Sequence, residues 1–149
     1  MTVLVSGGAG YIGSHMALRL LDGGKDVVVL DNLTTGFDWA VDHRAELVQG
    51  NSGDIPFVTD LIKSRGIEEI IHFAGSIIVP ESVENPLKYY ANNTCTSRNL
   101  IEAAVNGGVK RFVFSSTAAV YGEPKEIPIR EDAPKLPISP YGQSKWMVE

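Results

Sequence analysis

The chain has 149 residues, of which 44% are hydrophobic and 21% charged, a composition typical of a soluble globular domain with one core. Its 13 basic and 18 acidic side chains give a net charge of −5, which excludes the basic surface of proteins that bind nucleic acid or an anionic membrane. The single cysteine, Cys95, cannot form an internal disulfide and favours a reducing compartment, so we expect a cytoplasmic protein. No apolar run approaches the roughly 18 residues that span a bilayer, and no signal peptide is expected.

Short runs of apolar and β-branched residues alternate along the chain with stretches of helical periodicity. In chain order, the predicted elements are a strand at 2–6, a helix that follows the glycines at 7–10 and ends before Gly23, strands at 26–30 and 45–49, a helix at 56–63, a strand at 69–73, a long helix at 86–106, a strand at 111–115 and a last helix that begins at Pro140.

Local signals set the ends of the later helices. Asn85-Pro86 is a typical helix start, and Gly107-Gly108 a typical stop. A proline-rich loop covers 124–140, and Ser139-Pro140 predicts an N-cap followed by the first helical residue. We expect this last helix to be still running at Glu149. The long helix carries apolar residues that predict a packing stripe, with Cys95 as a small buried residue. The stripe consists of Leu87, Ala91, Thr94, Cys95, Ile101 and Val105.

The predicted strands lack alternating polar residues, and most are followed by a helix. Such strands belong to a parallel sheet that is covered on both faces, because an exposed face would carry polar side chains. We therefore predict an α/β fold, a doubly wound parallel sheet of Rossmann type with five strands in the order 3-2-1-4-5.

A glycine-rich turn between the first strand and the first helix predicts a phosphate-binding loop. Residues 7–13 include Gly7, Gly10 and Gly13, which permit a tight turn and a close approach of backbone to phosphate. The amides at the start of the helix would face a pyrophosphate. Asp31 ends the second strand 18 residues after Gly13, where its carboxylate would accept bonds from the adenosine ribose. Since no basic residue follows at once, NAD is favoured over NADP.

Two Tyr-x-x-x-Lys spacings offer candidate catalytic pairs. Between Tyr121 and Lys125 lie a glycine and a proline, which oppose a helix. Tyr141 and Lys145 instead lie one turn apart at the start of a capped helix, so their side chains share a face. Because a nearby ammonium favours the phenolate, Tyr141 is the candidate base. Thr117 follows the fifth strand, where ligands bind in such sheets, and could hydrogen-bond a substrate alcohol.

Taken together, these motifs resemble the nucleotide-sugar branch of the extended short-chain dehydrogenase/reductases, and within it the enzymes that epimerise UDP-hexoses at C4. The matching segments are residues 7–15, 30–33, 71–75, 81–83, 86–93, 114–122 and 139–145. The resemblance covers the whole chain in the expected order. It implies that residues 1–149 are an NAD-binding Rossmann domain, truncated before a sixth strand and a carboxyl-terminal UDP-sugar domain.

The resemblance also implies a reaction. Tyr141, ionised with help from Lys145, would take the proton of the sugar 4-hydroxyl while C4 passes a hydride to NAD, and Thr117 would bond the 4-oxygen. The implied cofactor contacts are Gly7, Gly10, Tyr11, Ile12, Gly13, Asp31, Asn32, Asn51, Ser52, Phe73, Ala74, Gly75, Asn93, Ser115, Tyr141 and Lys145. Because the long helix resembles half of a dimeric bundle in this family, the implied partners are a UDP-sugar and a second copy of the chain.

Some residues depart from the family pattern, and others favour one reaction within the family over another. Asn51 stands where the family usually has an acid that contacts adenine. After Gly75 some members carry a lysine near the cofactor, whereas this chain has Ser76-Ile77-Ile78. The related dehydratases carry acidic residues directly after the threonine, whereas this chain has Ala118 and Ala119, so dehydration is disfavoured. Epimerases of UDP-glucuronate or of N-acetylated UDP-sugars remain possible.

Two other functional classes remain open as well. The chain could be an NAD-binding module without catalysis, or a reductase that releases an oxidised product. A metal site is not expected, because His15, His43 and His72 lack the spacing of metal ligands. His72, within an apolar strand, is expected to be a packed core residue.

Overall fold

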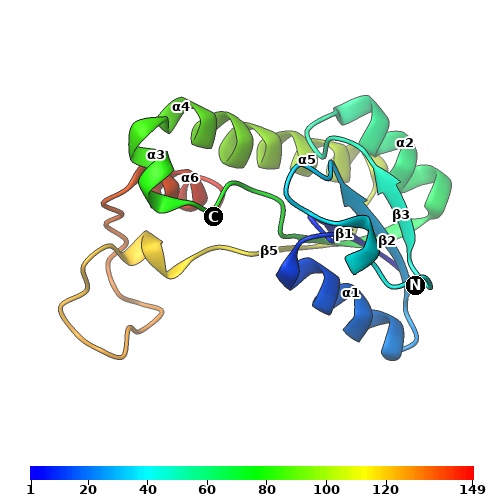
Figure 1. The fold of residues 1–149 in the computed structure, drawn as a ribbon, viewed down its shortest axis with the longest axis horizontal. Coiled ribbons are helices and arrows are strands. Elements are labelled where there is room, and N and C mark those ends of the chain that lie inside the picture. Colours follow the sequence, from blue (N-terminus) through cyan, green and yellow to red (C-terminus); the bar gives the residue numbers. More distant parts are fainter. The chain divides into compact units, whose positions relative to one another are not determined.

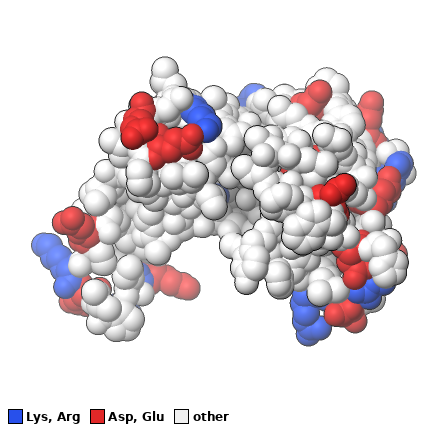
Figure 2. Space-filling model, viewed as in Figure 1, with Lys and Arg blue, Asp and Glu red and all other residues white.

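The computed structural model describes all residues, 1–149, and the chain divides into two compact units. Unit 1 comprises residues 1–74 and 98–115, and unit 2 comprises residues 75–97 and 116–149. None of the helices is long and apolar enough to cross a membrane. On the face seen in Figure 2, Lys and Arg side chains lie beside Asp and Glu side chains. Ion pairs join Arg44 to Asp22 in unit 1 and Lys88 to Glu81 in unit 2.

Unit 1 is built on a five-stranded parallel sheet in the order β3-β2-β1-β4-β5, which confirms the predicted topology. The strands are β1 (Thr2–Ser6), β2 (Asp26–Asp31), β3 (Glu46–Gln49), β4 (Ile67–His72) and β5 (Arg111–Phe114). The predicted strands agree with these within two residues at each end. β1 pairs with β2 from Thr2–Asp26 to Ser6–Leu30, so the carboxyl ends of both strands lie at one edge of the sheet.

Helices cover both faces of this sheet, because successive strand residues point to opposite sides. Leu4, Val28 and Leu30 pack against α2 (Ile55–Arg65) and the part of α5 (Thr96–Gly107) in unit 1. Val3, Val5, Val27 and Val29 pack on the other face with Ala17 and Leu20 of α1 (Tyr11–Asp22). Figure 1 shows α1 on one side of the sheet and α2 on the other. The doubly wound arrangement is therefore confirmed.

Unit 2 contains short helical segments and a long loop. They are α3 (Val79–Glu84), α4 (Pro86–Tyr89), the π-helix η2 (Tyr90–Cys95), the first residues of α5, the 3₁₀-helix η3 (Ala118–Tyr121) and α6 (Pro140–Trp146); a further 3₁₀-helix, η1 (Asp38–Ala40), belongs to unit 1. The predicted start of α6 is confirmed, since Ser139 Oγ accepts a hydrogen bond from the Gly142 N–H at 3.1 Å. The helix ends at Trp146 rather than running on to Glu149.

The long helix differs from the prediction in its middle and in its buried face. Its start is confirmed, because Asn85 caps α4 by accepting from the Lys88 N–H, but the π-helical turn of η2 inserts between α4 and α5. An extra residue in one turn rotates everything that follows on the helix surface. The predicted packing stripe is wrong: Leu87 is 77% exposed and Val105 is 74% exposed, and Ala91 is exposed as well.

Cys95 is exposed rather than buried, contrary to the prediction. It closes the π-helical turn, whose inward positions are taken by other side chains. The residues buried along this helix are Tyr89, Asn93, Ser97, Leu100, Ala103 and Ala104. This inward face is polar at Asn93 and Ser97 and apolar from Leu100 onwards. The spacing of apolar residues alone therefore predicts the wrong face of the helix.

Candidate functional site

The glycine turn and the end of β2 form the first part of the candidate site, all within unit 1. Gly7 has a left-handed backbone (φ 75°), and a Cβ built on it would lie 2.5 Å from the Ala74 nitrogen. A Cβ on Gly13 would lie 2.2 Å from the Gly7 carbonyl oxygen. The turn is therefore packed so closely against the start of α1 and the residues after β4 that neither position accepts a side chain.

The amino end of α1 is open to a ligand. Gly10 occupies the N-cap without any side-chain hydrogen bond, and the first turn holds no acidic residue. Tyr11 and Ile12 are 83% and 61% exposed. Unbonded amides at a helix start carry a partial positive charge and bind phosphate groups. This donor set fits the pyrophosphate of the predicted dinucleotide.

Asp31 lies beside this turn. Its carboxylate accepts from the Ala9 N–H at 3.0 Å and from the Leu33 N–H at 2.9 Å, so both oxygens are held by backbone donors of the turn and of the following loop. Each oxygen has a second lone pair available for a ribose hydroxyl. The buried, oriented carboxylate fits the predicted ribose acceptor, and it would repel a 2′-phosphate.

The other predicted contacts of unit 1 lie in loops after the strands. Phe73 and Ala74 follow β4, and their N–H groups donate to the Ser6 carbonyl oxygen; the Ser115 N–H after β5 donates to the His72 carbonyl. Asn32 and Asn51 are exposed, and Ser52 is buried. The Asn51 Oδ1 already accepts from the Gly53 N–H at 2.8 Å, which leaves one lone pair for an adenine amino group.

His72 itself is a core residue, as predicted. Its side chain is 1% exposed, and its Nδ1 lies 3.0 Å from Ser6 Oγ. No group of three or more His, Cys, Asp and Glu side chains in the chain could hold a metal ion.

The candidate catalytic pair lies on α6 in unit 2. Tyr141 and Lys145 both belong to this helix, one turn apart, whereas Tyr121 ends η3 and Lys125 lies in the loop after it. The interpretation that Tyr141 and Lys145 share a helix face, whereas Tyr121 and Lys125 do not, is confirmed. Thr117 lies before η3, where its Oγ1 accepts from the Ala119 N–H at 3.2 Å, so its hydroxyl hydrogen stays available for a substrate oxygen.

Hydrogen bonds tie this turn of α6 to the π-helix. The Ser144 Oγ donates to the Tyr141 carbonyl at 2.8 Å and accepts from Asn93 Nδ2 at 3.0 Å, and Thr94 Oγ1 donates to the Ser144 carbonyl at 3.0 Å. Both Asn93 and Ser144 are buried. Adjacent residues Asn93 and Thr94 reach the same helix. Sequence reasoning missed Ser144, although its position three residues after Tyr141 places it on the inward side of a short helix.

Asn93 also holds the segment after Gly75. Its Oδ1 accepts from the Ser76 N–H at 2.7 Å, and its Nδ2 donates to the Ser76 carbonyl at 3.0 Å. A Cβ on Gly75 would lie 3.1 Å from that same Oδ1. With both amide hydrogens used, Asn93 can offer a cofactor only its remaining oxygen lone pair.

Lys145 is only 5% exposed, and burial lowers the pKa of its ammonium to about 8, because a charge is poorly solvated inside the protein. Its charged form nevertheless predominates at neutral pH. In an unfolded chain the lysine holds its proton more tightly, so the pKa shift makes the folded state less stable as pH falls from about 10.4 towards 8, and the full cost is present below 8.

Replacing Lys145 with methionine, which has a similar length but no charge, should therefore stabilise the fold at neutral pH. We expect the free energy of unfolding to rise by up to about 3 kcal/mol near pH 7 and by much less near pH 10. Urea unfolding at the two pH values measures this, with the exposed Lys125→Met as the matched control. An equal change at both pH values would contradict the burial argument.

Comparison with known proteins relates this site to a family. A family model described as the NAD dependent epimerase/dehydratase family matches residues 3–149. The UDP-glucose 4-epimerase of Lacticaseibacillus casei is 53% identical over 149 residues, which are 100% of this chain and 45% of that protein.

Two solved structures are also similar. A UDP-Glc/GlcNAc 4-epimerase from Campylobacter jejuni aligns with a TM-score of 0.94 at 44% identity, covering 99% of this chain and 46% of that one. A UDP-glucose 4-epimerase from Brucella ovis in complex with NAD aligns with a TM-score of 0.96 at 41% identity, covering 99% and 45%. The chain thus spans less than half the length of the relatives it matches.

The family resemblance inferred from the motifs is confirmed by a match that runs through both the glycine turn and the Tyr141–Lys145 helix. The chain belongs to the NAD dependent epimerase/dehydratase family.

Proposed function

We propose that this chain binds NAD and carries the catalytic pair for reversible epimerisation at C4 of a UDP-hexose such as UDP-glucose or UDP-galactose. The observation that carries the proposal is the combination of the open α1 amino end beside Asp31 with the capped helix that bears Tyr141 and Lys145. The relatives named above are UDP-sugar 4-epimerases by their descriptions, which supports the same chemistry here.

In the proposed binding mode, the amides of Tyr11 and Ile12 hold the pyrophosphate, and Asp31 holds the adenosine ribose. The remaining proposed contacts are the other residues that the family resemblance implies, among them Asn51, Ser52, Asn93 and Ser115. Once bound, NAD would supply a reversible hydride acceptor for C4.

Side chains of the protein transfer the proton and bind the sugar oxygen. Tyr141, as the phenolate, takes the proton of the 4-hydroxyl, so that loss of hydride from C4 leaves a 4-ketone. Lys145, charged at neutral pH, favours the phenolate form by its positive charge. Thr117 donates a hydrogen bond to the 4-oxygen. In the return step Tyr141 would give its proton back to the 4-oxygen, and hydride delivered to the opposite face of C4 would invert its configuration.

The residues after Thr117 bear on whether the reaction is epimerisation or dehydration. Ala118 and Ala119 follow Thr117, and a methyl side chain cannot supply the acid or base that removes water from a keto sugar. The proposal is therefore epimerisation rather than dehydration. The relatives are about twice as long as this chain, and we assign residues 1–149 to their NAD-binding half.

We further propose a homodimer in the cytoplasm. Support comes from the large apolar side chains exposed along the long helix, including Leu87 and Val105, since such side chains are costly to leave in water. Sedimentation equilibrium measures the assembly.

The experiment that tests the proposal combines binding and turnover. Calorimetry with NAD should give a saturable site in residues 1–149, and the NAD-loaded full-length protein should convert UDP-galactose to UDP-glucose without accumulation of NADH. Absence of NAD binding would refute the whole proposal. NAD binding without turnover by the full-length protein would leave a non-catalytic NAD-binding module, and NADH formed in proportion to sugar would identify a reductase.

A further inference from the structure

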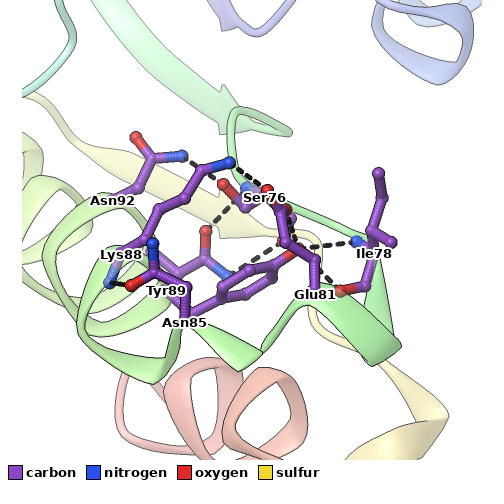
Figure 3. Close-up of polar contacts among 8 residues, drawn as sticks. Ser76, Ile78, Glu81, Asn85, Lys88, Tyr89 and Asn92 are labelled. Carbon is purple, nitrogen blue, oxygen red and sulfur yellow. Dashed lines mark hydrogen bonds and ion pairs between the residues drawn. The ribbon is translucent and has the colours of Figure 1, made fainter. Parts of the chain in front are cut away.

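The segment after Gly75 is held at a second place by a buried tyrosine. The Ile78 N–H donates to Tyr89 Oη at 3.0 Å, and Tyr89 Oη donates to the Ile78 carbonyl at 2.6 Å. Figure 3 shows the phenol of Tyr89 reaching from α4 to both backbone groups of Ile78. Together with Asn93 on Ser76, side chains of one helical stretch replace the backbone partners of residues 76 and 78.

Glu81 and Lys88 complete this arrangement. Glu81 Oε2 lies 2.7 Å from Tyr89 Oη, and the other oxygen of Glu81 pairs with Lys88 Nζ (Figure 3). The phenol has a single hydrogen for two acceptors, while the Ile78 N–H points at its oxygen. The hydroxyl is therefore held by partners on α3 and in the segment before α3, which fixes its position.

Tyr89 is not itself a candidate base. Its side chain is fully buried, and burial, with the hydrogen bond to Glu81, raises the pKa of Tyr89 to about 12. The phenol therefore stays protonated at neutral pH. Its polar end serves as an anchor, and its ring is left to make contact elsewhere.

That ring contacts the candidate base. The centroids of the Tyr89 and Tyr141 rings are 6.4 Å apart, with an interplanar angle of 88°. This edge-to-face contact is a favoured geometry for two aromatic rings, because the positive edge of one meets the negative face of the other. The direction of the Tyr141 ring thus depends on a neighbour whose own position is fixed at its hydroxyl.

We propose that Tyr89 is a positioning residue for Tyr141: its hydroxyl, bonded to the Ile78 backbone and Glu81, fixes a ring against which the Tyr141 ring is oriented. This inference rests on the proposed function, since it assigns Tyr141 the role of base. Sequence reasoning treated residues 81–83 and 86–93 only as matching segments and gave neither Glu81 nor Tyr89 a role.

The test compares Tyr89→Phe with Tyr90→Phe. Both variants lose one phenolic hydroxyl at adjacent positions, but Tyr90 is half-buried and its hydroxyl takes part in none of the hydrogen bonds described above. In Tyr89→Phe the ring remains while its anchor is lost. We expect kcat per bound NAD to fall roughly tenfold, since small misplacements of a catalytic group are costly, with KM for UDP-galactose within about twofold of the parent. Tyr90→Phe should change neither constant.

Two further readouts need no turnover. In protein with ¹³C-labelled tyrosine rings, the Tyr141 resonance, identified by its loss in Tyr141→Phe, should shift in Tyr89→Phe and stay in place in Tyr90→Phe. The Ile78 amide should exchange with deuterium at least about tenfold faster in Tyr89→Phe. Glu81→Gln, which keeps an acceptor of the same size, should retain most of kcat.

The outcomes separate this inference from the proposed function. An unmoved Tyr141 resonance, with kcat per bound NAD equal to that of Tyr90→Phe and only a lower melting temperature, would reduce Tyr89 to a structural residue and overturn the inference. If the NAD-loaded parent fails to convert UDP-galactose, the proposed function fails, and the resonance and the exchange rate alone decide whether Tyr89 orients the Tyr141 ring.

Discussion

Replacement of Tyr141 by phenylalanine in the full-length protein is expected to lower turnover of UDP-galactose by about 10³-fold while leaving NAD bound. The substitution removes the only atom that can accept the 4-hydroxyl proton in the proposed reaction, and positioned acid–base groups contribute factors of this size. A loss of 10³-fold corresponds to about 4 kcal/mol of transition-state stabilisation. Because phenylalanine keeps the ring that meets Tyr89 edge to face, the fold around α6 should be preserved.

The sequence itself supplies the matched control. Tyr121→Phe removes the hydroxyl of the other Tyr-x-x-x-Lys spacing, which the structure places at the end of η3 with its lysine in a loop. Its turnover should stay within about twofold of the parent. Initial rates, divided by the NAD content of each preparation, make the comparison. If Tyr121→Phe were the inactive variant and Tyr141→Phe the active one, the assignment of the base would be wrong.

The sheet could be predicted because each of its strands is specified by local sequence. Residues 3–5 and 27–30 are all apolar, without alternation, which only a sheet covered on both faces accommodates. Asp31 and the glycines before α1 carry a recognisable spacing. The start of α6 was equally predictable, because Ser139 and Pro140 are a local capping signal that does not depend on the rest of the fold.

The face of the long helix could not be predicted, since it depends on a π-helical turn. Nothing in residues 90–95 distinguishes that turn from an ordinary helix, yet it rotates the residues that follow. Cys95 at the end of this turn and Val105 after it, which regular spacing predicts to be buried, are exposed, while the polar Asn93 is buried. Asn93 tolerates burial because its amide hydrogens and oxygen find partners on Ser76 and Ser144. These partners are distant in sequence, so no local sequence pattern predicts them.

The network around Tyr89 was missed for a related reason. A tyrosine in an amphipathic helix is most simply a packing residue, and its value as an anchor depends on Ile78 and Glu81, which belong to another segment. The candidate base could be named from the spacing of Tyr141 and Lys145 alone. The groups that orient that base belong to separate segments of the sequence, and only the packed structure brings them together.

Replacement of Gly7 by alanine is expected to weaken NAD binding by at least about 100-fold and to destabilise the fold, whereas Gly24→Ala should do little to NAD binding. The two glycines have the same left-handed backbone, with φ of 75° and 74°, so alanine meets a similar conformational cost of roughly 1–2 kcal/mol at both. They differ in the space around them. A Cβ on Gly7 would lie 2.5 Å from the Ala74 nitrogen and 2.9 Å from the Phe73 carbonyl carbon, and a Cβ on Gly24 meets nothing within 4 Å.

The extra methyl at Gly7 can be accommodated only by moving backbone, because the atoms it meets are main-chain atoms of Phe73 and Ala74. Its own N–H donates to the Leu30 carbonyl at 2.8 Å, and its carbonyl accepts from the Gly10 N–H at 3.2 Å, so a shift there displaces the turn together with the open end of α1. Calorimetry with NAD and urea unfolding of the two variants separate close packing from backbone strain. Equal NAD affinity in Gly7→Ala and Gly24→Ala would mean that the turn does not hold the cofactor, and the phosphate-binding assignment of residues 7–13 would have to be abandoned.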